Sequence, residues 1–277
     1  MKKRNRFGIF TLVLILSLCG CTQDKIPISS SSDVQKEQDT LPEAEITPEE
    51  EPFLYGYQNL NEEEKTRYRQ ILAGIENYED SVTVEACSEE EINKVSNLVF
   101  VDHPEIFWLE QQNYSFNQKE NSDVDLLELN LVYNMGKDEI EDTKQQIEAK
   151  AEEWSQELSN CENEYDKIKY VYEFLGKNVL YDSESENNQN IQSVFLNQST
   201  VCMGFAKATQ YLLIRNGIFC TLVTGKVMPE NMEHAWNLVR IGENYYYVDT
   251  TWSSSGFVPE EDSIQDFSYT YLCCTAQ

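Results

Sequence analysis

Histidine is scarce in this chain, and the common cysteine motif for metal binding is absent. Its 277 residues include two histidines, His103 and His234, and there is no Cys-x-x-Cys pair. Structural zinc sites need several cysteine or histidine ligands at short spacings. The sequence therefore predicts no metal site, and we expect no cofactor.

Positive charge is also scarce. The chain has 21 Lys and Arg against 49 Asp and Glu, a net charge of −28. Such an excess of negative charge repels phosphate backbones and anionic lipid headgroups. We therefore expect no nucleic-acid partner and no binding of the folded part to an anionic membrane surface.

Long apolar runs are limited to one, Phe7 to Leu18, which follows a basic N-terminus. A run of about a dozen apolar residues is typical of a signal peptide and too short to span a bilayer comfortably. Leu18-Cys19-Gly20-Cys21 follows and resembles a bacterial lipobox. The resemblance implies cleavage before Cys21, a lipid on its sulfur, and anchoring at the extracytoplasmic face of the membrane. The alternative is an ordinary secretory signal.

The cysteines after Cys21 lack the regular spacing of a disulfide framework. An exported protein can form disulfides, so their redox state stays open. We expect buried core roles, the usual fate of an isolated cysteine, for Cys87, Cys161 and Cys220. Cys273 and Cys274 are adjacent, which makes them poor partners for each other.

Proline and glycine are sparse, with seven and eleven residues, and four of the prolines lie between residues 21 and 52. That segment also carries a serine run and many glutamates, a composition that favours a disordered linker. We therefore divide the chain into a signal peptide (1–20), a linker (21–52), a small α/β domain (53–136) and a larger domain (137–277).

Local patterns predict the elements of both domains. Asn61 with Glu64 predicts a capped helix start, and Ser88 a second helix start that runs to about Val101. Strands are expected over 81–86, 107–116 and 124–133. In the larger domain we expect helices over 138–160, 164–179 and 202–215, a helical turn over 192–196, and strands over 218–227, 234–241, 245–249 and 267–272.

Three residues in the larger domain can form a nucleophilic site. Cys202 falls in the first turn of a helix, where unpaired N–H groups and the helix dipole favour a thiolate. Gly242-Glu243 predicts a two-residue hairpin turn that pairs Ile241 with Asn244. This register puts His234 and Asp249 on one face of the sheet and diagonal to each other, within reach of their side chains.

Residues from about Glu164 to Trp252 resemble the transglutaminase-like core, a thiol fold related to papain. The matching motifs stand in order, and their chemically active members are 32 and 15 positions apart: Cys202-Met203-Gly204-Phe205-Ala206, His234-Ala235-Trp236-Asn237 and Tyr247-Val248-Asp249-Thr250-Thr251-Trp252. The resemblance implies an α+β fold in which a helix bundle, including the nucleophile helix, packs on an antiparallel sheet. The segment Asp102 to Trp108 also resembles one upstream of such cores in exported bacterial proteins.

The same resemblance implies roles for these residues. Cys202 would be the nucleophile, His234 the general base and acid, and Asp249 the orienting carboxylate, acting on an amide through a thioester. The substrate would be a protein, a peptide or peptidoglycan. Tyr181 is a candidate second oxyanion donor beside the Cys202 N–H, and a packed tyrosine is its alternative role.

Other functions stay open at this point. The thioester can be resolved by water or by an amine, so hydrolysis and crosslinking are equally compatible with the motifs. A surface lipoprotein that keeps the fold as a catalytically inactive binding or assembly module is the alternative from another class. A purely structural spacer of the cell envelope is disfavoured by the packed C-terminal domain.

Overall fold

The computed structural model describes residues 41–109, 116–119, 126–229, 231–253 and 267–275. Residues 40–277 form one compact unit, and a hydrophobic cluster extends from Ala44 to Val248. The expected signal peptide, Cys21 and the linker up to residue 40 lie outside the described residues. Within these ranges, no helix is both long and apolar enough to cross a membrane. The division at residue 136 stays a prediction.

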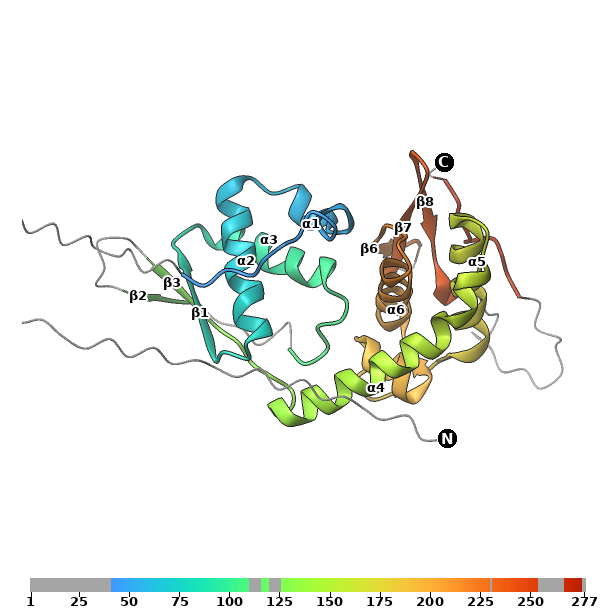
Figure 1. Cartoon of the computed structure of the whole chain (residues 1–277), viewed down its shortest axis with the longest axis horizontal. Helices are drawn as coiled ribbons and strands as arrows, with labels where there is room; N and C mark the ends of the chain where they lie inside the picture. Colours follow the sequence, from blue (N-terminus) through green and yellow to red (C-terminus); the bar gives the residue numbers. More distant parts are fainter. Residues whose placement is uncertain (1–40, 110–115, 120–125, 230, 254–266, 276–277) are drawn as a thin grey trace, which may run out of the picture. The chain divides into compact units, whose positions relative to one another are not determined.

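The N-terminal half combines helices with a small antiparallel sheet. In Figure 1 the helices α2 and α3 lie beside a sheet of strand order β1-β3-β2. Both predicted caps are confirmed, because Asn61 and Glu64 form a reciprocal capping box and the Ser88 hydroxyl accepts from the Glu91 N–H at 3.1 Å. The elements are η1 (Glu51–Phe53), α1 (Tyr55–Gln58), α2 (Glu62–Glu76), β1 (Ser81–Glu85), α3 (Glu89–Asp102), β2 (Phe116–Lys119) and β3 (Leu126–Asn130).

The C-terminal half is built around one helix and one antiparallel sheet. Helix α6 contacts β6 and β7 of the β6-β7-β8 sheet, while α5 packs against α6 and η4 (Figure 1). The predicted α+β class, with the nucleophile helix on an antiparallel sheet, is confirmed. The elements are α4 (Lys137–Ser155), η2 (Gln156–Asn160), α5 (Glu164–Asn178), β4 (Leu180–Tyr181), the π-helical turn η3 (Ser193–Asn197), β5 (Ser199–Thr200), α6 (Cys202–Arg215), β6 (Cys220–Val227), β7 (Met232–Ile241), β8 (Asn244–Val248) and η4 (Thr250–Trp252).

Small residues let α6 approach its neighbours closely. Gly204 lies where an added Cβ would come within 1.9 Å of the Thr200 hydroxyl and 3.1 Å of the Asn188 carbonyl oxygen. The absence of a side chain therefore allows the first turn of α6 to rest against the segment that leads into it. This close contact holds the position of Cys202.

Three expectations differ from the structure. The linker does not extend to residue 52, because Ala44 is buried and its N–H donates to the Arg69 carbonyl on α2 at 2.9 Å. The expected strand over 107–116 is wrong at its start, since Phe107 and Trp108 are buried in a loop. An apolar run of this length fits a buried loop as well as a strand, so periodicity could not separate them.

The third difference is at the C-terminal end. The expected strand over 267–272 is wrong, because these residues form turns and irregular structure. Backbone pairing occurs just after them, where Cys274 exchanges hydrogen bonds with Tyr247 at 2.8 and 3.0 Å. The Asp249 N–H also donates to the Tyr271 carbonyl at 3.0 Å. This segment therefore covers the edge of β8 and supports the backbone at Asp249.

Candidate active site

Cys202 is the first residue of α6, as the sequence predicted. Its N-cap, Val201, has an extended backbone and provides no side-chain cap, so the N–H groups of the first turn are not used by a capping side chain. The thiol is partly buried. The end of a helix with uncapped N–H groups favours a negative charge, and this position therefore favours the thiolate.

The hairpin β7–β8 brings His234 and Asp249 together. The predicted register is confirmed, with Ile241 paired to Asn244 and Asn237 paired to Val248. Gly242 adopts a φ of +59°, which a two-residue hairpin turn requires and which glycine adopts without steric cost. Counting from this turn puts Asp249 just beyond β8, diagonal to His234.

The side chains of His234 and Asp249 meet at short range. His234 Nε2 lies 2.6 Å from Asp249 Oδ2, and only 6% and 11% of the two side chains are exposed. The other carboxylate oxygen, Oδ1, accepts from the Thr251 N–H at 3.1 Å. Because both oxygens are engaged, the carboxylate has a fixed orientation toward the imidazole.

The imidazole also interacts with the Cys202 thiol. Burial raises the pKa of Cys202, but hydrogen bonds from the His234 side chain and from the Ala235 and Met203 backbones outweigh burial and bring this pKa below its ordinary value. For His234 burial lowers the pKa, yet hydrogen bonds with Asp249 and Cys202 raise it to about 9. These opposite shifts favour a thiolate beside an imidazolium.

Two tryptophans enclose the imidazole of His234. The Trp236 ring stacks on it with centroids 5.8 Å apart, and Trp252 meets it edge-on at 5.7 Å. The indole N–H of Trp252 lies 2.8 Å from His234 Nε2, the ring nitrogen that also faces Asp249. The rings reduce the access of water to the His234–Asp249 pair, which strengthens the electrostatic interaction between them.

Tyr181 lies close enough to Cys202 to interact with it electrostatically. The pKa of Tyr181 is raised by burial and by the nearby Cys202 charge. Its strand β4 pairs in parallel with β5, so that Tyr181 stands beside Thr200, two residues before the thiol. Tyr181 therefore lies near the thiol, while its role as an oxyanion donor stays a prediction. Cys21, the expected lipidation site, lies outside the described residues.

Four other described cysteines have pKa values that shift in the direction opposite to that of Cys202. Burial raises the pKa of Cys87, Cys161, Cys220 and Cys273, the last to about 11. Cys220 is fully buried as expected, whereas Cys87 and Cys161 are only partly buried and pack at the margin of the core. All six described cysteines are free thiols.

Sequence reasoning assigned no role to Asn237, although this residue links the two halves of the site. Asn237 is fully buried on β7, and its amide nitrogen donates to the Ala206 carbonyl of α6 at 2.9 Å. The hydroxyls of Thr209 and Thr250 form a second link, 2.9 Å apart, between α6 and η4. The signal for Asn237 was available, since it shares the inward-facing parity of Ala235 and Val239 along β7.

The described residues around Cys202 form no cluster of metal ligands. Across the described ranges, no group of three or more His, Cys, Asp or Glu side chains is arranged to hold a metal ion. His103, the other histidine, is engaged elsewhere, with its Nδ1 2.8 Å from Glu105 Oε1. The described site thus brings the Cys202 thiol, the His234 imidazole and the Asp249 carboxylate together.

Comparison with known proteins agrees with this reading of the fold. Residues 152–250 match the family model of the transglutaminase-like superfamily. A curated relative is the Kyphoscoliosis peptidase of Mus musculus, 24% identical over 127 residues, which cover 40% of this chain and 19% of that protein. The chain therefore spans about a fifth of the length of this relative.

Solved structures with similar folds have low overall similarity to the chain. The crystal structure of a TGase has a TM-score of 0.37 and 17% identity, over 69% of this chain and 54% of that one. The periplasmic domain of TgpA from Pseudomonas aeruginosa has a TM-score of 0.30 and 11% identity, over 62% and 68%. The family match, together with α6 on the antiparallel β6-β7-β8 sheet, shows that residues 152–250 have a transglutaminase-like fold.

Proposed function

We propose that the protein is a thiol enzyme that acts on amide bonds through Cys202, His234 and Asp249. One observation carries the proposal: the imidazole of His234 lies 2.6 Å from the buried Asp249 carboxylate and also lowers the pKa of the Cys202 thiol. A base held in this way activates a nucleophile and fixes the tautomer of its ring.

The proposed reaction has two steps. The Cys202 thiolate attacks the amide carbonyl carbon, and the His234 imidazolium gives its proton to the departing amine as the C–N bond breaks, leaving a thioester. Water or a primary amine then attacks the thioester, His234 accepts a proton, and the C–S bond breaks to restore the thiolate. The products are an amine with either a carboxylic acid or a new amide.

The oxyanion of each tetrahedral intermediate needs hydrogen-bond donors. The Cys202 backbone N–H is at the uncapped start of α6 and is one candidate. Tyr181, which interacts electrostatically with Cys202, is the second candidate. Tyr181→Phe would test this role by keeping the ring and removing the hydroxyl. We expect a lower kcat with little change in KM, since an oxyanion donor acts mainly in the transition state.

The substrate class follows from the chemistry of the site and from the relatives. We propose a protein, peptide or peptidoglycan substrate. The mouse relative is named a peptidase, which supports hydrolysis, while the same thioester permits transfer to an amine. Incubation with glutamine-containing peptides, with and without a primary amine, separates the two outcomes by mass. A mass gain of the amine less ammonia indicates transfer, and conversion of glutamine to glutamate or a cut peptide indicates hydrolysis.

The test of the enzyme itself compares the wild-type chain with Cys202→Ala and Cys220→Ala. We expect product with the wild type and with Cys220→Ala, which removes a buried thiol away from the proposed chemistry, and none with Cys202→Ala. Absence of product with every peptide, together with slow alkylation of Cys202 below the usual thiol pKa of about 8.5, would instead indicate an inactive binding module.

We also propose that the chain is exported and anchored by a lipid on Cys21. The basic N-terminus, the apolar run and the lipobox-like Leu18 to Cys21 support this location. A multiply acylated cysteine would hold the protein firmly, since each buried methylene contributes about 0.8 kcal/mol. In bacterial cells, labelled fatty acid should be incorporated into the wild type and not into Cys21→Ser.

A further inference from the structure

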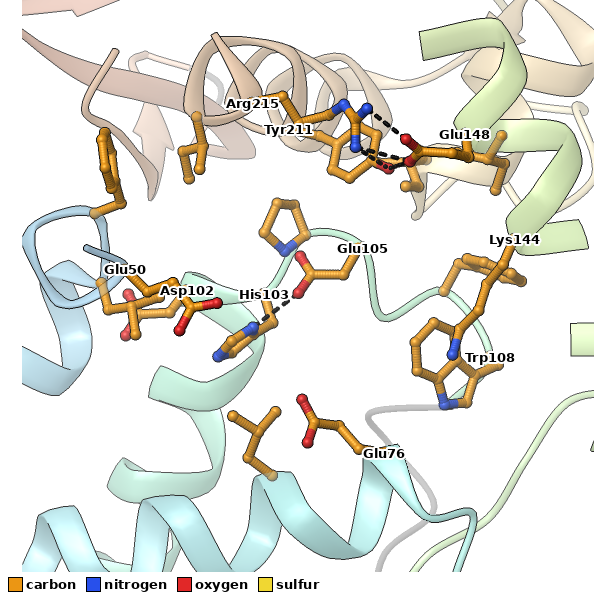
Figure 2. Close-up of a pocket in the computed structure, with 18 of the residues that line it drawn as sticks. Glu50, Glu76, Asp102, His103, Glu105, Trp108, Lys144, Glu148, Tyr211 and Arg215 are labelled. Atoms are coloured by element: carbon orange, nitrogen blue, oxygen red, sulfur yellow. Dashed lines mark hydrogen bonds and ion pairs between the residues drawn. The ribbon is translucent and has the colours of Figure 1, made fainter. Parts of the chain in front are cut away.

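A cavity of about 690 Å³ lies away from the proposed catalytic residues (Figure 2). It is lined by the segment from Glu45 to Leu54, the ends of α2 and α3, helix α4 and the C-terminal turns of α6. Cys202 begins α6 and Arg215, a lining residue, ends it, so the helix separates them by about 20 Å. The size is that of a small-molecule site.

Fixed positive charges in the cavity are already paired. The Arg215 guanidinium lies 2.5 and 2.7 Å from the two carboxylate oxygens of Glu148. The Lys144 ammonium lies 3.6 Å from Glu141 and 3.9 Å from the centroid of the Trp108 ring. Neither cation is left with its charge uncompensated, so the cavity does not attract an anion strongly.

Negative charge in the cavity is less well balanced. Glu76, the last residue of α2, makes no side-chain hydrogen bond or ion pair within the part of the chain that the structure describes. The Glu105 carboxylate forms an ion pair with His103 Nδ1 at 2.8 Å, and 42% of the Glu105 side chain stays accessible. In Figure 2 the two carboxylates project toward the same space from different walls. Burial raises the pKa of Glu76 most; the His103 charge lowers it and the Glu105 charge raises it, and the net effect is a raised pKa.

The walls around these carboxylates are largely apolar and aromatic. Trp108, Phe107, Phe53 and Tyr211 line the cavity together with aliphatic side chains. Trp108 is 3% exposed, and its indole N–H has no hydrogen-bond partner in the described structure. Aromatic faces attract cations, and the attraction increases where the cation is removed from water.

We propose that this cavity binds a small organic cation, with its ammonium group between Glu76 and Glu105 and its apolar part against the aromatic wall. The Glu76 carboxylate would gain the ammonium group as an ion-pair partner, and the apolar part of the ligand would be removed from water. The proposal is independent of the chemistry at Cys202, because the lining residues and the catalytic residues are different sets.

Three probes of similar size separate charge from shape. Phenethylamine carries the ammonium, 2-phenylethanol replaces it with a neutral group, and 3-phenylpropionate carries a negative charge. We would measure their binding to the full chain by calorimetry, in a Cys202→Ala background to prevent turnover of the amine. We expect phenethylamine to bind more tightly than the alcohol, and the carboxylate to bind least.

Substitutions then place the amine in this cavity. Glu76→Gln should weaken phenethylamine binding by about threefold to tenfold, as expected for loss of one partly enclosed ion pair, and Glu76→Lys should abolish it. Glu63 is exposed on the same helix, as Glu76 is, but does not line the cavity, so Glu63→Gln is the matched control and should bind as the parent does. Equal binding of amine and alcohol, or unchanged amine binding after Glu76→Gln, would overturn the proposal.

Discussion

Replacing Asp249 with asparagine probes the coupling between the three residues of the site. Asp249→Asn keeps the size and shape of the side chain and removes its charge. The Oδ2 atom of Asp249 lies 2.6 Å from His234 Nε2, so the variant loses a charge-assisted hydrogen bond to the imidazolium. Cys202 is not in itself altered, which makes its reactivity a reporter of the state of His234.

The expected magnitude follows from the energy of that hydrogen bond. A hydrogen bond to a charged group contributes about 1.5–3 kcal/mol, and each pKa unit corresponds to about 1.36 kcal/mol. The pKa of His234, raised to about 9 in the native protein, should therefore fall by about one to two units. Cys202 would then lose its cationic neighbour at a lower pH, and its own pKa should rise toward the ordinary value.

The assay is alkylation of Cys202 by iodoacetamide between about pH 5 and pH 10, which spans the relevant thiol and imidazole pKa values. Mass spectrometry of the peptide that contains Cys202 separates this thiol from the other cysteines. In the wild type we expect alkylation well below the usual thiol pKa, and in Asp249→Asn a profile displaced to higher pH. Asp142→Asn, an exposed position on α4, is the matched control.

One result would refute the reasoning. If Asp249→Asn alkylates with the same pH profile as the wild type, the carboxylate does not support the imidazolium, and the proposed coupling is wrong. A displacement of equal size in Asp142→Asn would show that the shift arises from the overall negative charge of the chain and not from the short contact.

Three further predictions concern packing and buried charge. Gly204→Ala should destabilise the protein by about 1–3 kcal/mol in urea unfolding, because the new methyl group would lie 1.9 Å from the Thr200 hydroxyl; unchanged stability would contradict the tight contact. Asn237→Ala should lower the free energy of unfolding by about 1–3 kcal/mol through loss of its bond to Ala206, and a wild-type melting temperature would argue against this link. Burial lowers the pKa of Lys207 from 10.5 to about 8, so between these pH values the unfolded chain binds more protons than the folded protein. The free energy of unfolding should therefore rise with pH in this range, by up to about 3 kcal/mol. Lys207→Met should remove that rise, and parallel pH profiles of stability for the two proteins would contradict the prediction.

Local patterns in the sequence determined much of the site. The Asn61 and Ser88 caps, the start of α6 at Cys202 and the hairpin turn at Gly242 depend on residues a few positions apart, and all four agree with the structure. From that turn, the two-residue periodicity of strands was enough to place His234 diagonal to Asp249. Such features can be predicted because their interactions are short-range along the chain.

Other features depend on contacts between distant segments. The apolar run at Phe107 and Trp108 predicts a strand but forms a buried loop, because a short apolar run does not determine which surface will cover it. The bond from Asn237 to α6 joins residues 31 positions apart. The cavity beside Glu76 combines segments that are far apart in the chain, from residue 45 to residue 215. The sequence by itself determined the local elements and the order of the chemically active residues, and the tertiary structure decided which side chains meet, because long-range packing has no local periodicity.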